Sequence, residues 1–168
     1  LEADQRVCLI TCLREPLARF VSNFYFDLYH GFTSATSLES YIGSRDRTIS
    51  MHNYYCRILS GHQNDPLPVD AAIFTTAQQA LNKFDHCVRL QDGIEQLPVA
   101  LDWKIKAPRS PAASFGIRQI VSYLLRGKWK LLYFRWRYPY RPADCAFAEK
   151  FANDNHWDYQ LFKSLNSS

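Results

Sequence analysis

Apolar positions change their spacing along the chain, and this spacing predicts the first structural elements. Residues 6–13, RVCLITCL, form a nearly continuous apolar run, which is typical of a strand covered on both faces in a parallel sheet. Over residues 17–28 the apolar side chains recur every three or four positions, which predicts a helix with one buried stripe. Pro16 suits the first position of that helix, and Gly31 suits its end.

Further helices and one more strand are predicted downstream. Helices are expected over residues 50–59, 75–84, 93–101, 117–126 and 143–152, with a last helix from residue 155 and a short strand over 86–90. Residues 32–50 suit a loop or a short helix, and residues 103–116 suit an exposed linker or long loop. Residues 128–142, KWKLLYFRWRYPYRP, fit an edge strand and an ordered loop equally well. Strands that alternate with helices indicate an α/β fold with a mostly parallel sheet.

Capping residues mark two of the predicted helix starts. Thr75 or Thr76 can cap the helix that runs to Phe84. Asn155 is followed three residues later by Asp158, an arrangement that resembles a capping box. Both helices are therefore expected to be capped by their own side chains.

Length and cysteine content narrow the class of protein. The 168 residues suit a single domain with a hydrophobic core, and no apolar run approaches the roughly 18 residues of a membrane span. Because the sequence opens with Leu1 and not Met, we interpret it as a domain truncated at the amino terminus. The five cysteines form no CxxC pair, and their odd number indicates neither a zinc site nor a complete disulfide framework. Free thiols favour a reducing compartment such as the cytoplasm.

Basic residues are concentrated in one quarter of the sequence. The net charge is +4, but residues 103–143 hold ten Lys or Arg and no Asp or Glu, so the remainder carries −6. We treat 103–143 as a basic aromatic insertion or loop region within one domain, residues 1–168. Its basic side chains alternate with aromatic ones, which suits an acidic glycan or single-stranded nucleic acid, whereas an edge element with inward-packed aromatics is the plain structural alternative. The candidate residues for binding such a partner are Arg126, Lys128, Lys130, Arg135, Trp136 and Arg137.

Polar residues also stand where the first predicted strand passes into the first helix, in TCLREPLARFVSNFYF. Arg14 falls at the carboxyl end of the strand, where ligands bind in parallel α/β sheets. The first turn of the helix is expected to offer unpaired N–H groups and a positive dipole end to an anion. Arg14 adds a guanidinium fork that fits phosphate, and Ser22 lies on the helix face away from the core. The alternative is an i, i+4 ion pair between Glu15 and Arg19 beside a solvated Arg14.

The same stretch resembles the 3′-phosphate-binding segment of sulfotransferases that use 3′-phosphoadenosine 5′-phosphosulfate (PAPS). It is most similar to the carbohydrate sulfotransferases of the heparan sulfate 2-O-sulfotransferase type (sulfotransferase family 2), whose segment reads R-D-P-x-x-R-x-x-S-x-x-Y. Glu15 takes the place of the Asp in that pattern. The matching positions in this sequence are Arg14, Pro16, Arg19, Ser22 and Tyr25.

The resemblance implies a P-loop-NTPase-like, mostly parallel sheet flanked by helices, and an enzyme that moves a sulfuryl group from PAPS to a carbohydrate hydroxyl. Arg14 and Ser22 would hold the 3′-phosphate, and Arg19 would support the helix or contact the phosphate. PAPS is then the co-substrate, no metal is needed, and nucleic acid is less favoured than a glycan as partner. The alternative is a non-catalytic basic domain that binds nucleic acid or a polyanionic glycan through residues 126–141. Eukaryotic carbohydrate members of the resembled family work in the Golgi lumen, whereas the thiols favour the cytoplasm.

Three further segments resemble the family in order and spacing. NYYCRILSG is similar to N-x-x-x-R-x-L-x-G, and NHWDYQLF is similar to the closing N-x-x-D-x-x-L-Y pattern. KFDHCVRLQDGIEQLPVAL resembles a strand-and-helix segment that reads V-G-L-x-E, with Arg89 and Asp92 at the Gly and Glu positions. The family's 5′-phosphosulfate loop is not in this sequence, so the resemblance puts the donor-activating lysine and the catalytic base upstream. The histidines show no partner at useful spacing, and only His52 and His62 are candidates for a base within the chain.

Overall fold

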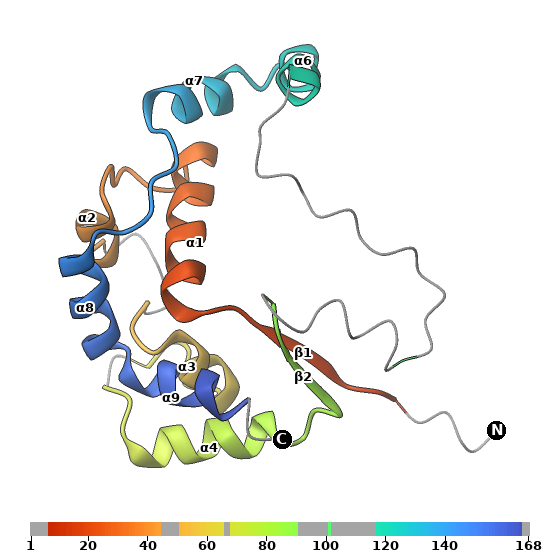
Figure 1. Cartoon of the computed structure of the whole chain (residues 1–168), viewed down its shortest axis with the longest axis vertical. Coiled ribbons are helices and arrows are strands. Elements are labelled where there is room, and N and C mark those ends of the chain that lie inside the picture. Colours follow the sequence, from red (N-terminus) through yellow and green to blue (C-terminus); the bar gives the residue numbers. More distant parts are fainter. Residues whose placement is uncertain (1–6, 45–50, 66–67, 91–100, 102–116, 166–168) are drawn as a thin grey trace.

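The chain folds into helices beside a short parallel sheet, and the computed structural model describes residues 7–44, 51–65, 68–90, 101 and 117–165 (Figure 1). These segments contain eight helices and a two-stranded parallel sheet, which confirms the mixed α/β character. The predicted linker over 103–116 and all but the last residue of the predicted helix over 93–101 lie outside the described residues. The elements are β1 (Ile10–Leu13), α1 (Pro16–His30), α2 (Leu38–Ile42), α3 (Tyr54–Ser60), α4 (Ala71–Leu81), β2 (His86–Arg89), α6 (Ile117–Leu125), α7 (Trp129–Arg137), α8 (Cys145–Asp154) and α9 (His156–Ser164).

The two strands pair in parallel along their whole described length, from Ile10 opposite His86 to Leu13 opposite Arg89. Parallel pairing requires a crossover, and the crossover from β1 to β2 includes α1 to α4. Both strands therefore end at the same edge of the sheet, next to the start of α1. The described segments hold these two strands only, so the larger P-loop-NTPase-like sheet stays a prediction.

The apolar run that contains β1 is less buried than its sequence predicts. Leu13 is 4% exposed, but Cys12 is exposed, and Val7 and Leu9 are 74% and 45% exposed. The expectation of a strand covered on both faces is therefore wrong for the described part of the chain. Helices cover the sheet at its carboxyl end, where Leu13 joins a buried cluster with side chains of α3, α4 and α9. Within the described segments, no such layer covers Val7 or Leu9.

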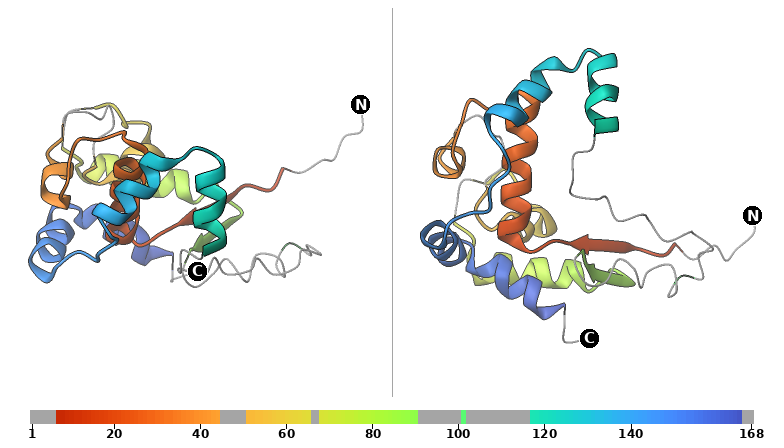
Figure 2. Two further views of the ribbon diagram at one scale, coloured as in Figure 1. Left: turned by 90° about the horizontal axis from the view of Figure 1, so that it is seen from above. Right: turned by 45° about the horizontal axis from the view of Figure 1, so that its top comes forward.

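The main hydrophobic core lies between α1, α2 and α8. One stripe of α1 supplies Phe20, Val21, Phe24 and Leu28, as the helical spacing predicted. Aromatic rings fill the space between the helices: the ring of Phe20 lies 4.9 Å from that of Phe151. This core fixes α1 at an angle to the sheet, and Figure 2 shows β1 and β2 beside its first turn and α7 beside its far end.

The ends of α1 lie where the sequence predicted them. Pro16 occupies the first turn, where its missing N–H costs nothing. Gly31 ends the helix with φ 72°, a left-handed conformation that other residues rarely adopt, and the N–H of Phe32 donates to the carbonyl of Asp27. The Glu15 side chain caps the amino terminus, which the sequence did not reveal.

The starts of α3 and α9 cap each other. Asn53, at φ 49°, precedes α3, and its side chain accepts from the N–H of Asp158 in α9. In return, the Asp158 carboxylate accepts from the N–H groups of Tyr55 and Cys56 at 3.0 and 2.9 Å. The side chain of Asn155 accepts from the N–H of Asn53 at 2.7 Å. The predicted capping box within α9 is therefore wrong, because its polar side chains are used across the helix pair.

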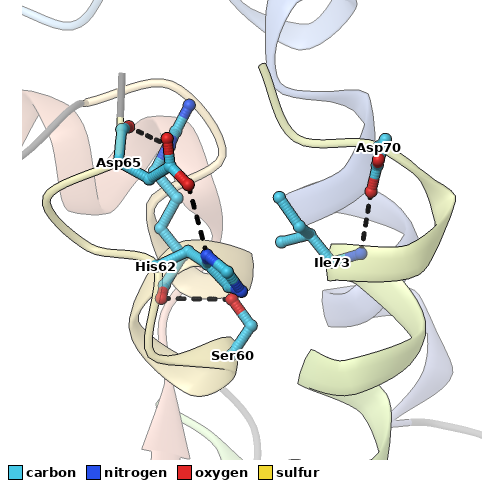
Figure 3. Close-up of polar contacts among 6 residues, drawn as sticks. Ser60, His62, Asp65, Asp70 and Ile73 are labelled. Atoms are coloured by element: carbon cyan, nitrogen blue, oxygen red, sulfur yellow. Dashed lines mark hydrogen bonds and ion pairs between the residues drawn. The ribbon is translucent and has the colours of Figure 1, made fainter. Parts of the chain in front are cut away.

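Two other predictions about elements need correction. Residues 129–137 form α7, a helix, and are neither the edge strand nor the ordered loop that the pattern allowed. The helix that was expected to begin at Thr75 or Thr76 begins at Ala71 and is capped by Asp70, whose side chain accepts from the N–H of Ile73 (Figure 3).

Candidate phosphate-binding site

Arg14 lies at the carboxyl edge of the sheet, between the last residue of β1 and the first residue of α1 (Figure 1). Its backbone is held by a tertiary contact and not by the sheet. The Tyr55 hydroxyl donates to the Arg14 carbonyl at 2.9 Å and accepts from the Arg14 N–H at 3.1 Å. The carbonyl of the preceding residue, Leu13, accepts from the N–H of Leu90 at 2.8 Å. The backbone that carries the Arg14 side chain is thus fixed on both sides.

Ser22 lies in the second turn of α1, on the face opposite the buried stripe. It lies six positions after Pro16, which corresponds to about 9 Å along the helix axis. Arg14 and Ser22 are both half-buried. Among the described residues, neither the Arg14 guanidinium nor the Ser22 hydroxyl has a hydrogen-bond partner. Both side chains are therefore available to a ligand.

The first turn of α1 offers less to an anion than the sequence predicted. The Glu15 carboxylate accepts from the N–H of Leu17 at 3.1 Å and of Ala18 at 2.6 Å, and Pro16 has no N–H. The next N–H, of Arg19, donates to the Glu15 carbonyl at 2.9 Å. The expectation of unpaired N–H groups is therefore wrong, because the chain's own carboxylate occupies them. An anion at this site depends on side chains.

The Glu15–Arg19 ion pair, the alternative raised from the sequence, is also not formed within the described residues. The Glu15 carboxylate instead accepts from the Tyr159 hydroxyl at 2.6 Å, which ties α1 to α9. Burial, together with the neighbouring Glu15 carboxylate, raises the pKa of Tyr159 above its ordinary range. Tyr159 therefore acts as a donor to Glu15 over the physiological pH range.

Arg19 is directed toward α3. Its guanidinium lies 3.9 Å from the ring centroid of Tyr54 and 5.5 Å from that of Tyr55, in cation–π geometry. Its Nε is buried and has no hydrogen-bond partner among the described residues. Burial lowers the Arg19 pKa, and the nearby Tyr55 and Asp158 oppose that shift. This packing fits the helix-support role that was expected for Arg19 more closely than a phosphate contact.

Two arginines of the other family-like segments bind backbone carbonyls. Arg57 is 4% exposed and donates from Nε to the His52 carbonyl at 3.0 Å and from a terminal nitrogen to the Asp65 carbonyl at 2.7 Å. Arg89, which stands at the family's Gly position, donates to the Phe162 carbonyl at 3.0 Å in the last turn of α9. These contacts give both residues structural roles: Arg57 holds the segments just before and after α3, and Arg89 joins β2 to the distant α9.

One histidine has a partner that the sequence analysis did not assign. The His62 Nδ1 lies 3.3 Å from an Asp65 carboxylate oxygen, in the loop after α3 (Figure 3). The hydroxyl of nearby Ser60 donates to the Arg57 carbonyl and not to His62, so the three do not form a Ser–His–Asp relay. His52, the other candidate base, lines a separate cavity of about 200 Å³ between α2 and α8 with Glu39 and Lys150.

The basic aromatic residues lie at the other end of α1 from Arg14. The Tyr29 hydroxyl, in the last turn of α1, donates to the Tyr138 carbonyl at 2.9 Å, and the Arg135 guanidinium lies 5.3 Å from the Tyr29 ring. The length of α1, 15 residues, corresponds to about 22 Å. The structure therefore places Arg14 just before α1 and Ser22 within it, but does not bring the candidate residues of the basic aromatic region to them. The exposed members of that set are Arg126, Lys128, Lys130, Trp136 and Arg137.

Two further observations limit the classes of site. Among the described residues, no group of three His, Cys, Asp or Glu side chains is placed to hold a metal ion. No helix in the described segments is long and apolar enough to cross a membrane.

Comparison of the chain with protein-family models, with curated proteins and with solved structures finds no match. The site residues themselves therefore carry the functional proposal.

Proposed function

We propose that this chain is part of a PAPS-dependent sulfotransferase domain, in which Arg14 and Ser22 bind the 3′-phosphate of the donor. The supporting observation is the pair of half-buried polar side chains, eight residues apart on a strand–turn–helix, with no partner among the described residues. The neighbouring polar side chains Glu15, Tyr55 and Tyr159 are hydrogen-bonded. Arg14 and Ser22, the two residues that the family pattern assigns to phosphate, thus differ from these three neighbours in having no hydrogen-bond partner among the described residues.

The chemistry of these two residues suits a phosphate monoester. A guanidinium presents parallel N–H donors that match two phosphate oxygens, and these charge-assisted hydrogen bonds are about twice as strong as neutral ones. A serine hydroxyl donates to a third oxygen. Arg19, stacked on Tyr54, contributes a further positive charge in the same part of α1 without needing direct contact.

Sulfuryl transfer places demands similar to those of phosphoryl transfer, namely in-line geometry and positive charge near the transferred group. Fixing the 3′-phosphate anchors one end of the donor and orients the sulfate toward an acceptor hydroxyl. In this proposal the described residues bind the nucleotide, and none of them is assigned to proton transfer. The carbohydrate acceptor follows from the family resemblance.

Calorimetry with adenosine 3′,5′-bisphosphate tests the proposal. We expect the wild-type chain to bind it at least about tenfold more tightly than adenosine 5′-phosphate, because a bidentate contact to phosphate contributes about 1.5–3 kcal/mol. Arg14→Ala should abolish this preference, and Ser22→Ala should weaken it. Arg126→Ala, an exposed arginine at the far end of the molecule, is the matched control. Equal binding of the two nucleotides by the wild type, or an effect of Arg126→Ala equal to that of Arg14→Ala, would falsify the proposal.

A second candidate function is polyanion binding through residues 126–141. The observation that favours it is the exposure of Trp129, Tyr133 and Trp136 between exposed basic residues, which contradicts the alternative of inward-packed aromatics for these three positions. Leu131 is buried and Phe134 is half-buried, so α7 still packs one side on the protein. Oligonucleotide or glycan binding that falls steeply with salt and is unchanged in Arg14→Ala would favour this candidate.

A further inference from the structure

The helix pair α6–α7 carries a large share of the exposed apolar surface. Six of the thirteen large apolar side chains that are exposed among the described residues belong to it: Ile120, Val121, Leu125, Trp129, Tyr133 and Trp136. Leu125 is 84% exposed and Trp136 is 79% exposed, so these side chains make few contacts with the protein. Contiguous exposed apolar surface on a folded protein commonly marks an interaction site.

The apolar residues form ordered stripes and not scattered points. Trp129, Tyr133 and Trp136 follow one another at i, i+4 and i+7, so they share one face of α7. Val121 and Leu125 are four residues apart and share one face of α6. Leu131 points the other way and is buried against the protein. Each helix thus presents an apolar face outward; we call these two faces together the α6–α7 surface.

The charge around the α6–α7 surface has a single sign. Arg126, Lys128, Lys130 and Arg137 are all exposed, and residues 117–143 contain no Asp or Glu. Arg135, by contrast, lies over the Tyr29 ring and belongs to the packing of α7 on α1. The partner of this surface must therefore combine negative charge with a medium in which apolar side chains are buried.

We infer that the α6–α7 surface docks on an anionic lipid membrane. An acidic glycan or a nucleic acid would use the basic residues and the aromatic rings, but the aliphatic Val121 and Leu125 would gain nothing from either polymer. In a lipid surface the same side chains enter the acyl region, tryptophan and tyrosine lie at the headgroup level, and lysine and arginine meet the anionic headgroups. This combination accounts for all three kinds of exposed residue.

The position of the helix pair permits docking. Figures 1 and 2 show α6 and α7 at one end of the molecule, with the sheet and the start of α1 toward the other end. Arg14 is separated from α7 by most of the length of α1, so a membrane at α6–α7 leaves the candidate phosphate site uncovered. The inference does not depend on the proposed sulfotransferase function, since it uses neither Arg14 nor Ser22, but it assigns to a membrane the surface that the second candidate function gives to a polyanionic polymer.

Vesicle co-sedimentation of the full chain tests the inference. We expect binding to phosphatidylcholine vesicles that contain 30% phosphatidylserine, weak binding to pure phosphatidylcholine, and loss of binding as salt rises. Neutralising both lysines in Lys128→Ala/Lys130→Ala should lower partitioning about fivefold per residue. Trp129→Ala/Trp136→Ala should lower it by about tenfold or more, because the rings leave the interface. In the wild type, tryptophan emission should shift to shorter wavelength on binding, and this shift should be lost in the tryptophan variant.

Exposed residues outside the α6–α7 surface supply matched controls. Phe26→Ala/Phe32→Ala removes two exposed apolar rings, and Lys83→Ala/Lys150→Ala removes two exposed lysines; both should bind vesicles as the wild type does. Unchanged circular dichroism shows that each variant is folded. Equal affinity for neutral and anionic vesicles, binding to heparin or oligonucleotide but not to vesicles, or self-association through this surface would each overturn the inference.

Discussion

Replacing Tyr55 with Phe tests whether the fold holds Arg14 in place. The Tyr55 hydroxyl donates to the Arg14 carbonyl at 2.9 Å and accepts from its N–H at 3.1 Å. Phenylalanine keeps the ring and removes both bonds. A buried donor or acceptor left without a partner costs about 1–3 kcal/mol, and at half-buried Arg14 water replaces part of that loss. We therefore expect the free energy of unfolding to fall by about 1–2 kcal/mol.

Tyr54→Phe is the matched control, one residue away on α3. The Tyr54 ring carries the Arg19 guanidinium, but its hydroxyl has no hydrogen bond among the described residues. Its removal should change the free energy of unfolding by less than about 0.5 kcal/mol. Urea unfolding measures both variants, and calorimetry with adenosine 3′,5′-bisphosphate should show weaker binding for Tyr55→Phe alone, because Arg14 is less preorganised. Equal unfolding free energies for the two variants would refute the reasoning.

The same hydroxyl gives the prediction a pH dependence. Burial raises the pKa of Tyr55 to about 12, whereas an unfolded tyrosine titrates near its ordinary value of about 10. Because the folded-state pKa is the higher one, the stabilisation is fully present below pH 10 and is lost as pH rises through about 12. Wild-type stability should therefore fall more steeply than that of Tyr55→Phe above pH 10. Parallel pH profiles would contradict this assignment.

Two further variants separate stability from binding. Glu15→Ala removes the cap of α1 and the acceptor of Tyr159, so thermal unfolding should show a loss of about 1–2 kcal/mol, while affinity for adenosine 3′,5′-bisphosphate should rise because a carboxylate leaves the site. An affinity that falls in step with stability would contradict this. Asp158→Ala leaves the N–H groups of Tyr55 and Cys56 without their buried acceptor and should cost about 2–5 kcal/mol in urea unfolding. A loss below about 1 kcal/mol would show that water or other groups replace the carboxylate.

Elements specified by local sequence could be predicted. The start of α1 at Pro16, its end at Gly31 and the strand over 86–90 all depend on conformational preferences of neighbouring residues. The short α7 could not be predicted in the same way. Its segment combines aromatic side chains, which favour strands, with basic ones that tolerate either state. Tertiary packing favours the helix, since Phe134 packs against the main core and Leu131 is buried.

The contacts that fix the candidate site join residues far apart in sequence. Arg14 and Tyr55 are 41 residues apart, and Asp158 meets the N–H of Tyr55 across 103 residues. No periodicity or spacing signals such pairs in a single sequence. The capping role of Glu15 could have been predicted from the sequence, since an acidic residue directly before a proline at a helix start is in the N-cap position. The motif residues Asn53 and Asp158 were noticed for their resemblance to a family, but their mutual capping required the fold.

The proposed phosphate contact of Arg14 and Ser22 requires no rearrangement of the backbone. Binding costs free energy when loops and side chains must be ordered, at about 0.5–1.5 kcal/mol for each flexible side chain. At this site the backbone of Arg14 is already held by Tyr55, and Ser22 belongs to a helix whose opposite face is fully packed. Only the Arg14 side chain itself remains to be ordered. The Glu15 carboxylate repels an anion at this site. The net affinity therefore depends on whether the attraction of the Arg14 guanidinium exceeds that repulsion. Arg14→Ala should lower the affinity and Glu15→Ala should raise it, so the two variants measure the two contributions separately.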